Sequence, residues 1–356
     1  MTECTAAADD NVSRLMQMIN GFQASQAIYV AVTLGIPDLL HREPLCSDRL
    51  ASLTGSHCAS LYRLLRALAA IGLLHEGPDR AFALTSLGRG LVSGLTDSRN
   101  AWAGFAARPP LWAAWGELLH SVRTGETAFR HVHGTDVWTF RAKRPEESTI
   151  FNLAMRDASA SLARELLAAC DFMPADHIID IGGGDGTLLA GVLKKYQQAK
   201  GTLLDLPHVT AGAGEVLEQA GVRDRCNIVS GSFFDDIPAG GDVYLLKSIL
   251  HDWNDGAALH LLRNCRRAMH AEAKLLIIER LLAPPNEGME GKLSDLNMLV
   301  NAGGRERTRE DFAALIESAG LELNAITPLS AWRFIIEATP NEAVGRAELE
   351  TKDHLR

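Results

Sequence analysis

Apolar residues in the first hundred positions recur at helical spacing, with short breaks between the periodic segments. One pair of helices is especially clear: Ser47 opens a helix, Gly55 ends it, and from Ala59 onward leucines recur every three or four residues along one stripe. A short β-rich ribbon follows at residues 80–92. Two helices followed by a small ribbon predict a winged-helix arrangement.

The hydrophobic pattern changes twice in the rest of the chain. Residues 101–170 are rich in Trp, Ala and Leu, and their periodicity predicts helices. From His177 onward, short β-rich runs alternate with helical stretches, which is typical of a parallel sheet with helices on both faces. The last two β-rich runs, 321–329 and 332–340, are joined too tightly for a helical crossover. We therefore expect one of them to run antiparallel at the sheet edge.

The composition indicates a globular protein with enough material for a large core or two smaller ones. The chain has 356 residues, of which 47% are hydrophobic and 22% charged, and its mean hydropathy is near zero. No segment approaches 18 uninterrupted apolar residues, and the N-terminus carries acids where a signal peptide would carry basic residues. We expect a cytoplasmic protein with no membrane partner.

The charge distribution argues against nucleic acid as a partner. The formal charge is −9 and the pI is near 5.7, which gives no electrostatic footprint for nucleic acid or anionic lipid. Residues 1–100 hold eight arginines, no lysine and nine acids, so a winged helix there would present no basic face to DNA. Dimerisation is the better interpretation of this domain. A DNA-binding regulator is kept as an alternative, which a gel shift at low salt would test.

The six cysteines are scattered without a C-x-x-C pair or a Cys/His ligand cluster. This spacing argues against a disulfide framework and against a structural zinc site. We expect ordinary buried thiols and no bound metal.

The segment HIIDIGGGDGTLLAGVL, residues 177–193, joins a predicted strand to a predicted helix through a glycine turn. Such a turn lets a ligand approach the backbone at a helix N-terminus. Gly182, Gly184 and Gly186 form G-x-G-x-G, with Thr187 where the dinucleotide fingerprint requires its third glycine or alanine. No G-K-[ST] follows, which excludes a P-loop. The alternative is that these glycines serve only a tight turn.

Two acids at strand ends narrow the ligand that this turn could hold. Asp180 precedes the glycines, where an acid suits a cationic or amine-bearing ligand better than a pyrophosphate. Asp205 ends the next strand and is placed to accept both hydroxyls of a ribose. A nucleoside with an amino group and without phosphates points to S-adenosylmethionine.

A second group of polar residues follows the buried run DVYLLK. Lys247 ends that strand, and His251, Asp252 and Trp253 precede a helix capped near Asn254 or Asp255. Ligands of open α/β sheets bind beyond the carboxyl ends of the strands, so this segment is expected at the same crevice as the glycine turn. A histidine there could act as a base, or could be a hydrogen-bonded structural residue.

Two glutamates favour the catalytic interpretation of His251. Glu279 ends the strand LLIIE, and Glu306 lies in NAGGRERT, before a helix predicted to start near Thr308. A carboxylate beside an imidazole fixes its tautomer and stabilises the imidazolium that forms when it takes a proton. Taken alone, either acid is equally explained as a surface charge or a helix cap.

The motifs IDIGGGDG, DLPHV, LKSILHDWND and GGRERT, in this order after a mainly helical N-terminal part, resemble the plant-type caffeic acid and hydroxyindole O-methyltransferases and their bacterial natural-product relatives. The resemblance covers residues 24–338. It implies an α/β fold: a Rossmann-like class I methyltransferase domain with a mostly parallel seven-stranded sheet, preceded by a winged-helix dimerisation domain. The expected parts are residues 1–100 for dimerisation, 101–172 as helical linker and substrate lid, 173–340 as catalytic domain and 341–356 as polar tail.

The resemblance also implies a homodimer whose N-terminal domain helps to close the partner's pocket, with His251 as general base flanked by Glu279 and Glu306. S-adenosyl-L-methionine is the expected cofactor and S-adenosyl-L-homocysteine the expected product. The residues expected to bind the cofactor are Asp180, Gly182, Gly184, Asp205, Leu206, Ser232, Phe233, Lys247 and Asp252. Relatives usually carry an acid where this chain has Ser232, so the adenine contacts are expected to be weaker or rearranged.

The expected acceptor is a small aromatic molecule with a phenolic hydroxyl. The resemblance places four residues near it: Phe151, Met155, Met298 and Asn301. Three tryptophans are candidates for flat walls: Trp102, Trp112 and Trp138. Core packing is the alternative for each of these side chains. N-methylation, or a reaction other than methyl transfer, is the alternative chemistry.

Overall fold

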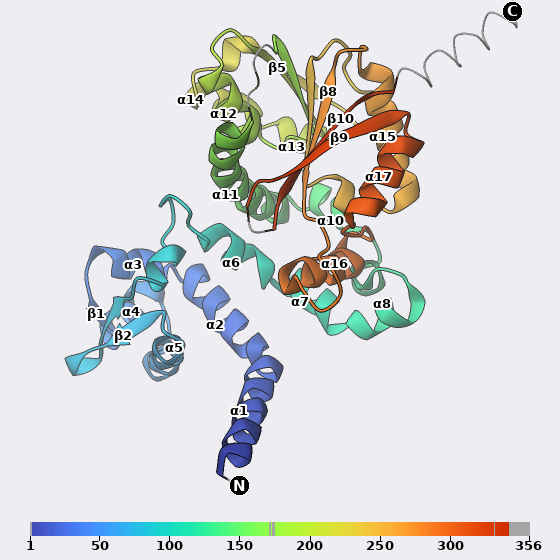
Figure 1. Cartoon of the computed structure of the whole chain (residues 1–356). Coiled ribbons are helices and arrows are strands. Elements are labelled where there is room, and N and C mark those ends of the chain that lie inside the picture. Colours follow the sequence, from blue (N-terminus) through green and yellow to red (C-terminus); the bar gives the residue numbers. More distant parts are fainter. Residues whose placement is uncertain (1, 171, 173–174, 331, 342–356) are drawn as a thin grey trace, which may run out of the picture. The chain divides into compact units, whose positions relative to one another are not determined.

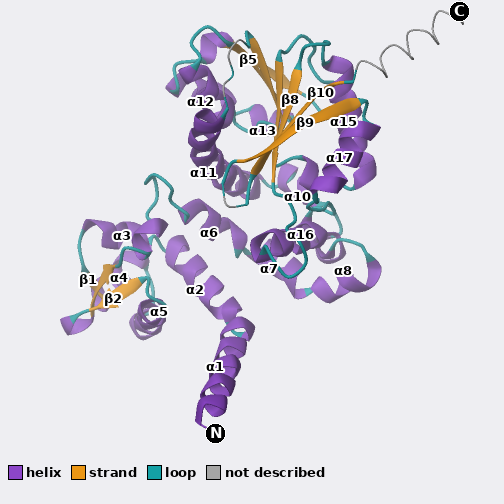
Figure 2. Ribbon diagram, in the orientation of Figure 1, coloured by secondary structure: helices purple, strands orange, loops and turns teal. Residues whose placement is uncertain are grey.

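The computed structural model describes residues 2–170, 172, 175–330 and 332–341. The chain divides into two compact units, Met1–Trp112 and Ala113–Arg356, and helix α7 (Pro109–Gly116) contains the boundary between them. Figure 2 shows that strands are concentrated in the second unit and that the first is mainly helical. None of the helices in the described ranges is long and apolar enough to cross a membrane.

The first unit has a winged-helix arrangement. Its elements in chain order are α1 (Thr2–Ile19), α2 (Gly21–Thr33), α3 (Ile36–Arg42), β1 (Leu45–Cys46), α4 (Ser47–Thr54), α5 (Cys58–Ala70), β2 (Leu74–Glu76), η1 (Pro78–Arg80), β3 (Ala81–Leu84), η2 (Gly88–Leu91) and α6 (Asn100–Ala106). The three strands form an antiparallel sheet in the order β1-β3-β2. Leu50, Leu61, Leu65, Leu68 and Phe82 form the centre of its core. The leucine stripe of α5 therefore shares one core with the ribbon, and the predicted winged-helix arrangement is confirmed.

The second unit begins with helices and continues as alternating strands and helices. The helices are α8 (Leu118–Thr124), α9 (Ala128–His133), α10 (Val137–Ala142), α11 (Pro145–Ala169), α12 (Thr187–Lys195), α13 (Pro207–Thr210), α14 (Ala213–Gln219), η3 (Arg223–Arg225), η4 (Leu250–Asp252), α15 (Asp255–Ala268), α16 (Met289–Asn301) and α17 (Arg309–Ser318). The strands are β4 (His177–Ile181), β5 (Lys200–Asp205), β6 (Cys226–Ser230), β7 (Val243–Lys247), β8 (Lys274–Glu279), β9 (Leu321–Pro328) and β10 (Phe334–Pro340).

These seven strands form one sheet in the order β6-β5-β4-β7-β8-β10-β9. The first five pair in parallel, and β10 runs antiparallel to both β8 and β9. The mostly parallel seven-stranded sheet is confirmed. The expectation that the antiparallel strand lies at the edge was wrong: β10 lies between β8 and β9, because the tight hairpin leaves β9 outermost.

Neighbouring residues of each central strand pack into different cores, because successive side chains point to opposite faces of a sheet. Ile179, Leu246 and Ile277 belong to the core that α15 and α17 cover. Their neighbours Ile178, Leu245 and Ile278 belong to the core that α11, α12 and α14 cover. Figure 1 shows these two groups of helices on opposite faces of the sheet. Both faces are covered, and the carboxyl ends of the strands are left to carry a site.

Some expectations about the remaining segments are refined by the structure. Residues 101–112 belong to the first compact unit and 113–172 to the second, so the expected linker is divided between them. Cys226 and Cys265 are buried thiols as expected, but Cys46 and Cys58 are exposed, which corrects the expectation for these two. All but the first residue of the predicted tail, 341–356, lies outside the described residues.

Candidate active site

The glycine turn joins the end of β4 to the start of α12 and leaves no room for side chains at two positions. Gly182 has a φ of +67°, in the left-handed region that favours glycine. A Cβ atom at Gly182 would collide with Ile249, and one at Gly183 would collide with the carboxylate of Asp180. Only glycine at these two positions lets the turn pack against Ile249 and Asp180.

The two strand-end aspartates play different parts beside this turn. Asp205 accepts backbone N–H groups from Gly184 at 2.8 Å and from Leu206 at 2.7 Å. Asp180 is 1% exposed, and neither of its carboxylate oxygens has a hydrogen-bond partner among the described residues. Burial raises the pKa of Asp180 to about 7, although the charge of Lys247 opposes this. An unpaired buried carboxylate is costly, so Asp180 fits a cationic group that a ligand brings to the turn.

A cavity opens beside the glycine turn. Of the nine residues predicted to bind the cofactor, eight line it: Gly182, Gly184, Asp205, Leu206, Ser232, Phe233, Lys247 and Asp252. Asp180 is not part of the lining and lies against Gly183. The hydroxyl of Ser232 accepts the N–H of Phe234 at 3.1 Å, so the serine supports the turn after β6.

One wall of the cavity comes from α10 and α11. Phe151 and Met155, two of the predicted acceptor residues, line this wall together with Trp138. Sequence reasoning missed the polar residues of the same wall: Arg141, Ser148, Asn152, Arg156 and Ser159. Helical spacing in the sequence could have indicated them. The lining residues on α11 recur every three or four positions from 148 to 159, so they share one face of the helix with Phe151 and Met155. Trp102 and Trp112 belong to the other compact unit and do not line this cavity.

Lys247 connects the sheet to this wall. It is half-buried at the end of β7, and its Nζ donates to Ser159 Oγ on α11 at 3.0 Å. Burial lowers the pKa of Lys247, while the carboxylates of Asp180 and Glu279 favour its charge. The lysine thus holds α11 against the carboxyl edge of the sheet.

His251 lies in the 3-10 turn η4 and is held by two buried glutamates. Its Nδ1 is 3.1 Å from Glu306 Oε1 and 3.6 Å from Glu279 Oε2. The side chains of both glutamates are only 1% exposed, and that of His251 is 11% exposed. The other nitrogen, Nε2, makes no hydrogen bond within the described ranges and lies 3.7 Å from Oδ1 of Asp252, which lines the cavity. His251 itself is outside the cavity lining and sits directly behind Asp252.

The two glutamates are fixed by different contacts. Glu279 Oε1 accepts the backbone N–H groups of Ile249 and Leu250, both at 2.9 Å, which ties the end of β8 to the turn carrying His251. Glu306 Oε1 accepts from Ser294 Oγ at 2.7 Å. Oε2 of each glutamate is buried and has no hydrogen-bond partner in the part of the chain that the structure describes. The pair therefore concentrates negative charge around the ring.

This charge determines the protonation of the ring. Burial opposes a charge on His251, but Glu279, Asp252 and Glu306 together outweigh it and raise the pKa of His251 to about 10. Burial likewise opposes the charge of Glu306, but its hydrogen bond from His251 holds its pKa below the ordinary value. Burial raises the pKa of Glu279. At neutral pH the site therefore holds an imidazolium paired with Glu306.

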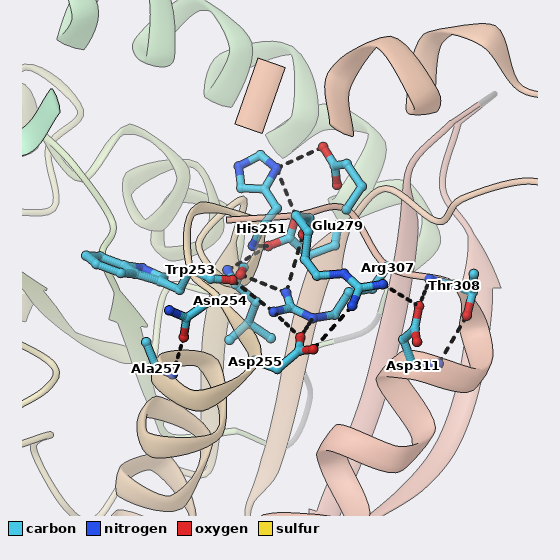
Figure 3. A network of polar contacts seen from close by, with 12 residues as sticks. His251, Trp253, Asn254, Asp255, Ala257, Glu279, Arg307, Thr308 and Asp311 are labelled. Carbon is cyan, nitrogen blue, oxygen red and sulfur yellow. Dashed lines mark hydrogen bonds and ion pairs between the residues drawn. The ribbon is translucent and has the colours of Figure 1, made fainter. Parts of the chain in front are cut away.

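A fully buried arginine, missed from the sequence, joins the two segments that meet at His251. Arg307 donates from Nη1 to the Leu250 carbonyl at 2.8 Å and from Nη2 to the Trp253 carbonyl at 2.9 Å. Its guanidinium also donates twice to Asp255 Oδ1, at 3.0 and 2.9 Å. Figure 3 shows this network, with the imidazole and the Asp255 carboxylate at opposite ends of it. Arg307 thereby fixes η4 against the strand-like segment that carries Glu306.

The remaining predicted acceptor residues, Met298 and Asn301, do not line the cavity. Met298 and Asn301 are each 8% exposed on α16, one and two turns beyond Ser294. Positions 294, 298 and 301 share a helix face, so this face approaches Glu306. Oδ1 of Asn301 is buried and has no hydrogen-bond partner among the residues described.

The same three catalytic candidates also have the composition of a metal site. His251, Glu279 and Glu306 each place a possible ligand atom within 4.8 Å of the others. A His and two carboxylates suit several divalent ions. The short contact between Nδ1 and Glu306 equally suits a hydrogen bond with no metal ion. Loss of activity on treatment with a chelator would distinguish a bound metal ion from such a hydrogen bond.

The fold and the cavity define a class I methyltransferase, and comparison with known families agrees. Residues 115–322 match the O-methyltransferase domain family, and residues 16–94 match the O-methyltransferase dimerisation domain family. The chain therefore belongs to the S-adenosylmethionine-dependent O-methyltransferases. The cradle of glycines, the orphaned Asp180 and the strand-end Asp205 fit this cofactor.

Individual relatives match over almost the whole chain. It is 42% identical to the phenazine O-methyltransferase PhzM of Lysobacter antibioticus, over 92% of this chain and 96% of the relative. It is 37% identical to an 8-amino-8-demethylriboflavin N,N-dimethyltransferase of Streptomyces davaonensis, over 91% and 94%. The crystal structure of the O-methyltransferase NcsB1 from neocarzinostatin biosynthesis, in complex with S-adenosylmethionine and 2-hydroxy-5-methyl naphthoic acid, aligns with a TM-score of 0.76 and 31% identity, over 89% of this chain and 96% of that one.

Replacing Asp205 by alanine should weaken the binding of S-adenosylmethionine by about tenfold or more, because a hydrogen bond to a buried charged group contributes about 1.5–3 kcal/mol. The change also releases the Gly184 N–H that shapes the turn. Calorimetry on the full chain measures the dissociation constant. Asp235→Ala is the matched control, because Asp235 is exposed and does not line the cavity. Equal affinities in the two variants would show that the glycine turn is not the cofactor site.

Proposed function

We propose that this protein methylates a phenolic hydroxyl of a small aromatic natural product, with His251 as the proton acceptor and without a metal ion. The observation that carries the proposal is the orientation of the His251 ring. Nδ1 is hydrogen-bonded to Glu306, and Nε2 faces Oδ1 of Asp252, a residue of the cavity wall, at 3.7 Å. A ring oriented by a carboxylate on one nitrogen is the arrangement that lets the other nitrogen take a proton.

The pKa of His251 suits it to accept a proton from a phenol. A phenol has an unperturbed pKa near 10, and the surrounding carboxylates raise the pKa of His251 to about 10. A raised pKa makes the neutral ring a stronger base, which favours its taking a proton from a phenol. Because the free ring is already protonated at neutral pH, each turnover first requires the loss of that proton to solvent.

S-adenosylmethionine, when bound, supplies a methyl group on a positively charged sulfur. The chain's own part is to hold the acceptor oxygen in line and to keep water out. Opposite charges disappear as the phenolate takes the methyl, and a dry wall favours this loss of charge more than water does. The aromatic side chains of Phe151, Phe233 and Trp253 supply such a wall.

The family match at residues 16–94 supports a homodimer for this chain. The phenazine and naphthoate compounds in the names of the relatives support a flat aromatic acceptor. Both features belong to the proposal.

N-methylation is the second candidate, and the similarity to the N,N-dimethyltransferase favours it. The buried carboxylates argue for oxygen chemistry, because a neutral amine needs less help from a base than a phenol does. The two candidates differ in the atom that is methylated.

Incubation with labelled S-adenosylmethionine and a panel of phenols and matching aryl amines tests the proposal. We expect label on a phenolic oxygen, located by mass spectrometry and NMR, and the same rate after dialysis against a chelator. Label only on nitrogen would establish the second candidate. A rate that falls with the chelator and returns with one divalent ion would assign His251, Glu279 and Glu306 to a metal.

The pH dependence of the rate should follow the titration of His251. At saturating cofactor, kcat/KM should rise with pH, with a logarithmic slope near one, toward a plateau near the pKa of about 10. Glu279→Gln removes the carboxylate that raises this pKa most, so the rising limb should move down by about one to three pH units. Initial rates across pH measure this shift.

The matched control for the pH profile is Glu337→Gln, which changes a carboxylate on β10 that pairs with Lys274 far from His251 in the chain. Its profile should coincide with that of the unaltered protein. If the rising part of the Glu279→Gln profile stays in place, or moves to higher pH, the proposed charge balance is contradicted.

The stability of the fold should fall over the pH range in which the rate rises. The raised pKa of His251 stabilises the fold fully below about pH 6.5, and this contribution is lost as pH rises toward 10.

A further inference from the structure

The wall formed by α10 and α11 differs chemically from the rest of the cavity. Its lining side chains are the donors Trp138, Arg141 and Asn152 and the apolar faces of Phe151 and Met155. The glycine-turn side, in contrast, carries the carboxylates of Asp185 and Asp205. The wall is thus suited to a flat ring that brings hydrogen-bond acceptors or negative charge.

Arg141 is the more buried of the two arginines of this wall, because Arg156 is 43% exposed and pairs with Asp185. Arg141 is 9% exposed, and its guanidinium carbon lies 3.7 Å from the ring centre of Phe151 and 5.1 Å from that of Trp138. Burial lowers the pKa of Arg141 to about 10, and Asp252 and Glu147 favour its charge, so it remains cationic at neutral pH. A guanidinium stacked on a ring keeps its N–H groups in its own plane, where a carboxylate can accept two of them.

Trp138 supplies a second donor beside this guanidinium. Its indole Nε1 is buried and finds no acceptor in the part of the chain that the structure describes. Buried donors are almost always satisfied in folded proteins, so an orphaned one at a cavity wall indicates an acceptor brought by a ligand. A cation and an orphaned donor on adjacent turns of one wall therefore favour the same kind of ligand group.

This wall is close to the proposed base. The rings of Trp138 and Trp253 are stacked with centres 6.1 Å apart, and Trp253 follows Asp252, whose Oδ1 lies 3.7 Å from His251 Nε2. The wall that carries Arg141 therefore adjoins the segment that carries the proposed base. A substituent directed toward Asp252 and one directed toward Arg141 would lie at different edges of the same ring.

We infer that the acceptor is an aromatic hydroxy acid whose carboxylate is bound by Arg141, with Trp138 Nε1 as a further donor. This inference rests on the proposed function, because it assumes that the phenolic hydroxyl of the same molecule faces His251. It assigns Arg141 as a specificity-determining residue. The alternative is that Arg141 only neutralises the buried carboxylate of Asp252, in which case it would confer no preference for an anionic ring.

The test compares two probes that differ by one carboxylate, 1-hydroxy-2-naphthoate and 1-naphthol. Each is titrated into the full-length protein with saturating S-adenosylhomocysteine, and binding is measured by calorimetry. The unaltered protein should bind the carboxylate probe about tenfold tighter or more, as expected for a paired charged hydrogen bond. Arg141→Met should abolish this preference while leaving the affinity for 1-naphthol within a few-fold.

Three further variants separate specificity from a general loss of structure. Arg141→Lys should retain part of the preference, because it keeps the charge without the planar fork. Trp138→Phe should weaken the carboxylate probe a few-fold and leave 1-naphthol unchanged. Arg144→Met is the matched control, because Arg144 also stacks on a phenylalanine, Phe140, at 3.8 Å but does not line the cavity; it should leave both affinities unchanged.

Equal binding of the two probes by the unaltered protein would overturn the inference, and so would a preference that survives Arg141→Met. Neither result would touch the proposed function if a phenol is still methylated. The protein could instead show a preference for the carboxylate probe that depends on Arg141 and yet methylate no phenol in the panel. That result would support the carboxylate site at Arg141 and reject the phenolic chemistry. The two proposals therefore fail by different observations.

Discussion

His251→Ala should lower kcat on the true acceptor by roughly 10²-fold or more while leaving the affinity for S-adenosylmethionine within a few-fold. The loss follows from removing a positioned proton acceptor, a role that typically contributes about 10²–10⁴-fold. Without the ring, the phenol must lose its proton to water. The cofactor affinity should hold because His251 does not line the cavity. Steady-state kinetics and calorimetry on the same preparation measure both quantities.

The His251 variant also makes a prediction that distinguishes a base from a structural residue. Its deficit should shrink for an acceptor whose phenol is already ionised at the assay pH, because such a phenol needs no proton acceptor. His270→Ala is the matched control, since His270 lies on the surface beside Asp242 and outside the site. Unchanged turnover in the His251 variant would reject this residue as the base. A deficit that is equally large for ionised and un-ionised phenols would assign it a positioning part only.

Arg307→Met should destabilise the fold by about 3 kcal/mol or more, because it leaves two buried carbonyl groups without donors and Asp255 without its buried partner. This corresponds to a fall in Tm of roughly 10 °C for a unit of this size. Arg307→Lys should fold but lose kcat, because one ammonium cannot hold both carbonyls that fix η4. Thermal unfolding and steady-state kinetics are the measurements.

Arg305 offers a matched control, because it pairs with the other oxygen of the same Asp255 but is 45% exposed. Exposed ion pairs contribute little, so Arg305→Met should change stability by less than about 1 kcal/mol. In Arg307→Lys, a loosened contact between His251 and Glu306 should also move the rising limb of the pH profile to lower pH. A variant with normal stability, normal kcat and an unmoved limb would show that Arg307 does not position the base.

Short-range signals in the sequence were sufficient to predict most of the fold. The glycine turn after β4, the Asn254 cap of α15 and the Thr308 cap of α17 each depend on a few consecutive residues. Backbone dihedrals and local hydrogen bonds govern such features, so they can be read without knowledge of distant contacts. The order of the last two strands could not be read this way, because either strand of a tight hairpin can pair with β8.

The sequence by itself determined the class of fold, the strand ends that meet at one edge, and fewer than half of the residues that line the cavity. The tertiary structure decided the charge of His251, because that charge depends on burial and on carboxylates from β8, η4 and the segment before α17. It also decided that Arg307 is buried beneath the base and that Arg141 lies on a ring within the cavity wall. Burial and Coulomb interactions act between residues that are far apart along the chain, and only folding sets the distances between them.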